Sequence, residues 1–123
     1  MVKVKALAFT GYPVTDMVHA RAFYEGVFNL KSTVSFEHEG KYWIEYDLGD
    51  STFALANMND QWKPAADGPM VAFEVEDFDA TVAALRARST RFAVEPMDSG
   101  VCRMAIVIDP SGNSLCVHRR HKS

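Results

Sequence analysis

The chain has 123 residues, of which 48% are apolar and 24% are charged, as is ordinary for a globular domain. Its net charge of −3 argues against nonspecific nucleic-acid binding, which requires a basic surface. No apolar run approaches the roughly 20 residues that a membrane span needs, and the N-terminus lacks a secretion signal. The two cysteines, Cys102 and Cys116, form no metal-binding motif. We therefore expect a reduced, cytoplasmic protein that binds neither nucleic acid nor a membrane.

The first half of the chain predicts the order strand, helix and three strands. Val2 to Tyr12 alternates like a strand, and Asp16 after the break at Pro13 is a helix-capping residue. An apolar stripe at helical spacing follows, consisting of Ala20, Phe23, Val27 and Leu30. Strands are then expected at 33–37, 41–48 and 52–56, because Gly40 and Gly49-Asp50 separate these runs.

The second half repeats this order after a segment without periodicity, residues 58–69, which reads as a linker. A strand is expected at 70–75, and Asp77 is a second helix-capping residue. The next helical stripe consists of Phe78, Val82 and Leu85. Three further strands are expected at 92–95, 102–108 and 114–118. The turn sequence DPSGN at 109–113 should join the last two as a hairpin.

The two halves align with each other. Val14-Thr15-Asp16 matches Val75-Glu76-Asp77, and Asp47 matches Asp109. Such repetition predicts two similar units buried against each other. We therefore predict an α+β fold, a single domain over 1–123 made of βαβββ modules at 1–57 and 70–118. The modules should form a curved mixed sheet cup with helices on its outer face, and a cup of this kind is a natural ligand site.

Three stretches resemble one family: VTDMVHARAFYEGVFNLK, VAFEVEDFDATVAALRAR and RFAVEPMDSGVCRMAIVIDPSGNSLCV. The chain resembles the glyoxalase / bleomycin resistance / extradiol dioxygenase superfamily, also called vicinal oxygen chelate proteins. It departs from the family at Asn29 and Ser89, where Gly usually follows each helix. In metal-dependent members the resemblance implies a divalent ion in the cup, held by His, Gln or Glu from the first and last strands of each half.

The resemblance places those ligand positions on Phe9, Met70, Cys116 and Ala54. A divalent ion needs three or four N, O or S donors, and this set offers at best a thiolate and a weak thioether. We therefore expect no metal and no cofactor, and an apolar pocket floor in which Cys116 packs as a small hydrophobe.

Two polar residues remain candidates for chemistry. Glu74 shares strand parity with Met70, and His118 shares a face with Cys116. Either residue could act as a base or as a polar contact to a ligand, and either could simply be a solvated strand end.

Two tryptophans remain candidates for ligand contact. Trp43 lies on the opposite face of its strand from Tyr42 and Tyr46, and the sequence leaves open which face lines the cup. Trp62 in the linker either covers a sheet edge or stacks on a planar ligand as a lid.

Three functional hypotheses follow. The first is a metal-independent glyoxalase/bleomycin-resistance-like homodimer that binds a small apolar or planar molecule in the cup without chemistry, with antibiotic resistance as its role. The alternative is a glyoxalase-like lyase or dioxygenase-type enzyme with non-standard catalytic residues, Glu74 and His118. The third is a relic with a structural or partner-binding role. The dimer would form either side by side or by exchange of halves through the linker.

Overall fold

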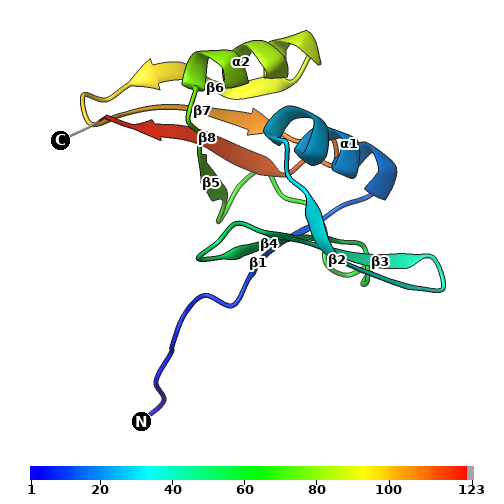
Figure 1. Cartoon of the computed structure of the whole chain (residues 1–123). Coiled ribbons are helices and arrows are strands. Elements are labelled where there is room, and N and C mark those ends of the chain that lie inside the picture. The colour runs from blue at the N-terminus through cyan, green and yellow to red at the C-terminus, as the bar shows by residue number, and fades with distance from the viewer. Residues whose placement is uncertain (122–123) are drawn as a thin grey trace.

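The chain folds into two four-stranded mixed sheets with two helices, and the computed structural model describes residues 1–121 (Figure 1). The strands of the first sheet are β1 Thr10–Pro13, β2 Ser32–His38, β3 Lys41–Asp47 and β4 Thr52–Ala56. Those of the second are β5 Val71–Glu74, β6 Arg91–Asp98, β7 Cys102–Ile108 and β8 Ser114–Arg120.

The first sheet has the order β1-β4-β3-β2 and the second β5-β8-β7-β6. The pairs β1–β4 and β5–β8 are parallel, and the other pairs are antiparallel. The predicted α+β fold of two βαβββ modules is confirmed, although strand pairing does not join the two sheets into one.

Both helices begin and end as their sequences direct. In α1 (Met17–Phe28) and α2 (Phe78–Ala87), the capping residues Asp16 and Asp77 accept backbone N–H bonds of 3.1 and 2.9 Å. Asn29 after α1 has a φ of 55°, and Ser89 after α2 has a φ of 57°. The serine therefore adopts the left-handed turn that a glycine would form, at a cost in backbone strain.

One core serves both modules. The sheet faces that meet the helices bring Phe53 of β4 and Phe73 of β5 to a ring separation of 5.1 Å, with Tyr24 of α1 packed against both. All three side chains are buried. The two modules are thus halves of one packed unit.

Buried polar groups join the modules across this core. The Tyr12 hydroxyl accepts the Val71 N–H and donates to the Ser114 carbonyl, at 2.7 Å each. Asn113 in the β7–β8 turn donates its amide to the Pro13 carbonyl at 2.8 Å. The predicted hairpin turn is therefore also a contact between modules.

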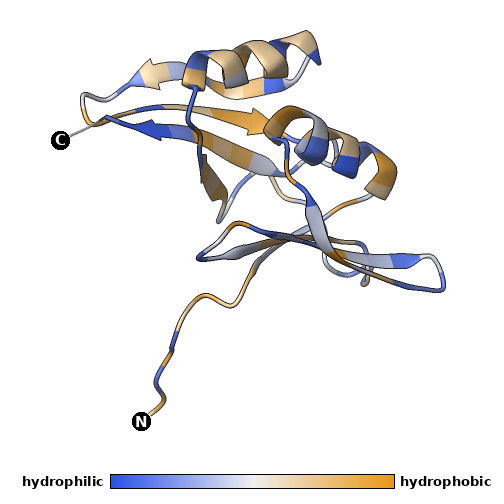
Figure 2. Cartoon of the chain, in the orientation of Figure 1, coloured by the Kyte–Doolittle hydropathy of each residue, from blue (hydrophilic) through white to orange (hydrophobic). Residues whose placement is uncertain are grey.

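The predicted strand from Val2 to Tyr12 is wrong over most of its length, because β1 begins only at Thr10. β1 pairs with β4, which has five residues, and within the described residues no strand pairs with the segment before Thr10. Residues 1–9, which we call the arm, are largely apolar, and the arm extends away from the body except at its end, where Phe9 packs against β3 (Figures 1 and 2). Among the described residues, no helix is both long and apolar enough to cross a membrane.

Candidate functional site

Each sheet has a face turned away from the helices, which we call its outer face from here on. It is the face that would line the inside of the cup expected from the sequence, opposite to the side that carries the helices. On β3, Ile44 and Tyr46 are buried in the core, so the alternating residues Trp43 and Glu45 lie on the outer face. This decides the orientation that the sequence left open, because Tyr46 packs with Phe53 on the helix side.

An aromatic cluster covers the outer face of the first sheet. The Phe9 ring meets the Trp43 ring edge-on, with centroids 5.0 Å apart. The Trp62 ring lies so close to Gly11 that a Cβ at this position would come within 2.9 Å of it. Ala54 and Ala56, which pair with β3 on this face, are fully buried. Small residues thus form a floor on which the rings lie.

Glu45 holds one of these rings in place. Its Oε2 accepts the indole N–H of Trp43 at 2.7 Å. In the β2–β3 register, Val34 lies opposite Glu45 and Phe36 lies opposite Trp43. Phe36 is 52% exposed, so an open apolar surface adjoins the carboxylate. The sequence reasoning missed Glu45, although its spacing of two from Trp43 places both residues on one face.

The outer face of the second sheet carries a carboxylate–imidazole pair. Glu74 Oε1 lies 2.5 Å from His118 Nδ1, and Glu74 Oε2 accepts the Arg120 N–H at 2.7 Å. The hydrogen bond from the Arg120 N–H lowers the pKa of the Glu74 carboxyl most, and the hydrogen bond with His118 lowers it further. The structure therefore brings together the two residues that the sequence proposed for chemistry, as a pair able to hold or pass a proton.

The positions that bind metal in the family carry poor donors here. Cys116 is 4% exposed, its thiol contacts the Val117 carbonyl at 3.7 Å, and burial raises its pKa, which favours the protonated thiol. Phe9 offers a ring, Ala54 a methyl group and Met70 a thioether. Such a set does not fit a hard or borderline divalent ion. Within residues 1–121, no three His, Cys, Asp or Glu side chains gather closely enough to hold a metal.

Two hollows beside these residues lie between the modules. Phe9 and Met70 line one groove of about 260 Å³, and Glu74 lines a neighbouring groove of about 430 Å³. The two grooves share four residues, Leu48, Ser51, Ala72 and Phe73. Neither groove is lined by Trp43, Cys116 or His118. A separate hollow of about 550 Å³ is lined by Trp62 and polar residues of the linker.

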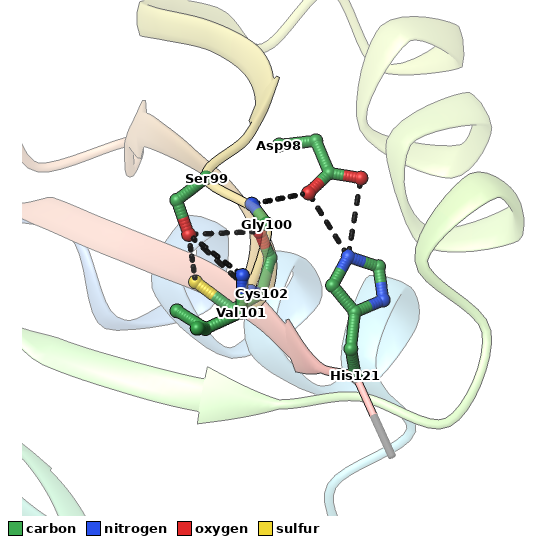
Figure 3. A network of polar contacts seen from close by, with 6 residues as sticks. All are labelled: Asp98, Ser99, Gly100, Val101, Cys102 and His121. Atoms are coloured by element: carbon green, nitrogen blue, oxygen red, sulfur yellow. Dashed lines mark hydrogen bonds and ion pairs between the residues drawn. The ribbon is translucent and has the colours of Figure 1, made fainter. Parts of the chain in front are cut away.

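A second polar network lies at the end of the second sheet (Figure 3). Asp98 accepts the Gly100 N–H at 2.8 Å and lies 2.9 Å from His121 Nε2. The Cys102 sulfur lies 3.5 Å from the Ser99 hydroxyl. The hydrogen bonds from the Gly100 N–H and from His121 lower the pKa of Asp98. The network thus connects the β6–β7 turn to His121, directly after β8.

The geometry agrees with comparisons against known proteins. The family model described as Glyoxalase/Bleomycin resistance protein/Dioxygenase superfamily matches residues 6–117. An antibiotic binding protein from Streptomyces sp. CB03234, TnmS3, is 18% identical with a TM-score of 0.76, over 98% of this chain and 100% of that one. A glyoxylase/bleomycin resistance protein/dioxygenase domain from Frankia sp. EAN1pec is 13% identical with a TM-score of 0.77, over 97% and 100%. The trypanothione-dependent glyoxalase I of Leishmania major is 20% identical with a TM-score of 0.76, over 94% and 87%. No match was found among curated proteins.

Proposed function

Because the chain belongs to the glyoxalase/bleomycin resistance protein/dioxygenase superfamily, we propose that it binds a small apolar or planar molecule and uses no metal to do so. The observation that carries this proposal is the residue set at the family's metal positions, Phe9, Met70, Cys116 and Ala54, which supplies apolar surface in place of donors. The fold similarity to an antibiotic binding protein supports a drug-like ligand and a role in antibiotic resistance.

The proposal includes a cytoplasmic homodimer. Apolar side chains are exposed on the outer faces of both sheets, with Val34 and Phe36 on the first and Val94 and Met97 on the second. Exposed apolar patches of this kind mark interaction surfaces, and the arm adds an extended apolar segment that pairs with none of the described strands. A second copy facing these surfaces would complete a cup between the two copies. The cytoplasmic location rests on the two free cysteines.

One observation favours catalysis as a second candidate. The Glu74–His118 pair has the geometry of a general base with its orienting partner, and it lies on an outer face accessible to a ligand. In that case a Glu74→Gln variant would bind ligand normally but lose turnover.

The binding proposal is tested by titration calorimetry, with the best ligand found by thermal-shift screening of planar drugs and metabolites. Phe9 is half-exposed, and covering such a side chain with a ligand contributes roughly 1.5–3 kcal/mol. Phe9→Ala should therefore weaken binding about ten- to a hundredfold, and Met70→Ala somewhat less because methionine contacts adapt. Met58→Ala is the matched control, because this exposed methionine lines none of the grooves described above. Unchanged affinity in folded Phe9→Ala and Met70→Ala would place the ligand elsewhere.

A further inference from the structure

The outer face of the first sheet combines aromatic rings with a fixed carboxylate. Phe36 and Trp43 lie opposite each other in the β2–β3 register, and Glu45 follows on the same face. The 2.7 Å bond from the Trp43 indole leaves the second oxygen of Glu45 with no protein partner among the described residues. A carboxylate held in this way can form an ion pair at little further cost in side-chain entropy.

The other charged groups at neighbouring positions keep this face acidic. Strand alternation places Lys41 and Asp47 at the two ends of β3 on the same face. The Lys41 ammonium is already paired with Asp60 at 3.1 Å, whereas Asp47 is exposed and, among residues 1–121, its side chain bonds only within its own turn. The face therefore attracts positive charge next to its rings.

We propose that this face selects planar cations: the ring system of the ligand stacks on Phe36 and Trp43 while its positive charge pairs with Glu45. This inference rests on the proposed function, and it names the class of ligand. Aromatic faces attract cations, and an ion pair to a carboxylate beside apolar surface is stronger than one in open water. A planar anion of the same shape meets repulsion from Glu45 and Asp47.

The test uses three dyes that share one ring system and differ in charge: aminoacridine as the cation, acridine as the neutral form at mildly alkaline pH, and acridine carboxylate as the anion. Fluorescence titration of the full chain should rank them in that order, and added salt should reduce the preference. Glu45→Gln should weaken aminoacridine binding about tenfold and leave acridine unchanged, since it removes one hydrogen-bonded ion pair and water recovers only part of that interaction. The amide oxygen of Gln still accepts the Trp43 N–H, so the ring should stay in place.

Two controls separate charge from folding and stacking. Glu37→Gln makes the same change of charge on β2 at an exposed position opposite Tyr42, on the helix side, and it should alter affinity less than twofold. Phe36→Ala should weaken all the dyes that bind, because it removes a stacking surface.

Equal binding of the three dyes to the wild type overturns the inference and leaves the proposed function standing, and this readout does not depend on any variant folding. Equal effects of Glu45→Gln and Glu37→Gln overturn it as well. Binding of none of the three dyes overturns the inference alone, because the proposed function is tested separately with the ligand from the thermal-shift screen and the Phe9 and Met70 variants.

Discussion

Replacing Asp109 by Ala should be among the most destabilising single changes in this protein. Asp109 is 4% exposed, and its carboxylate accepts four hydrogen bonds. They come from the Tyr24 hydroxyl at 2.7 Å, the Ser111 N–H and the Asn113 N–H at 2.9 Å each, and the Asn113 amide at 3.1 Å. The first of these joins α1 to the turn between β7 and β8, so the substitution loosens a contact between modules as well as a turn.

The magnitude follows from the groups that lose their partner. The Tyr24 side chain is fully buried, so its hydroxyl finds no water, and a buried donor without a partner costs about 1–3 kcal/mol. Each turn N–H loses roughly 0.5–1 kcal/mol, because water replaces the carboxylate only in part. We therefore expect a loss of about 2–5 kcal/mol in the free energy of unfolding, which corresponds to a fall in Tm of about 8–20 °C for a chain of this size.

The internal repeat supplies the matched control. Asp47 is the counterpart of Asp109 in the first module, but it is exposed and accepts only the Gly49 N–H at 2.8 Å. Asp47→Ala should therefore cost about 0.5 kcal/mol. Urea denaturation at one protein concentration measures the free energy of unfolding of both variants. Tyr24→Phe, alone and combined with Asp109→Ala, completes a double-mutant cycle that measures the Tyr24–Asp109 interaction. A cost for Asp109→Ala within 1 kcal/mol of the cost for Asp47→Ala would refute the reasoning.

Two further predictions concern the backbone and the arm. Ser89→Gly should raise the free energy of unfolding by about 0.5–1 kcal/mol, because the left-handed φ of 57° strains any residue with a Cβ. Asn29→Gly should raise the free energy of unfolding less, since asparagine tolerates this conformation. Urea denaturation measures both variants, and a lower free energy of unfolding in Ser89→Gly would contradict the assignment of strain. The full chain should be a dimer in light scattering at micromolar concentration, and removal of residues 1–8 should shift it towards monomer. A monomeric full chain would argue against the homodimer.

The sequence predicted those elements whose partners are close in the chain. β4 and β7 have the predicted bounds because glycine or proline turns delimit alternating runs that pair with their neighbours in hairpins. The strand expected from Val2 onwards fails because alternation reports a preference for extended backbone, while a strand also needs a partner with free hydrogen-bonding groups. Similarly, alternation along β3 places Trp43 and Tyr46 on opposite faces of the sheet, but it does not say which of the two faces packs against a helix.

The site was harder to predict for a related reason. A family pattern places Phe9, Met70 and Cys116 at equivalent points of their strands, and strand parity gives each a face. Their relative positions in space depend on how the two sheets are oriented, and that orientation is set by the packing of Phe53 against Phe73 in the shared core. As a result Phe9 and Met70 share a groove that Cys116 does not line.

The two modules share a fold but have divided its tasks. In the turn of the second module, Asp109 and Asn113 are buried and bond to the first module, whereas the equivalent turn of the first module is exposed at Asp47. The outer faces differ in the same way, since one carries the aromatic rings with Glu45 and the other carries the Glu74–His118 pair. None of the grooves described above is lined by both Trp43 and His118. If one ligand uses both kinds of chemistry, the two faces must be brought together by a second copy, and variants on the two faces should then complement each other in mixed dimers.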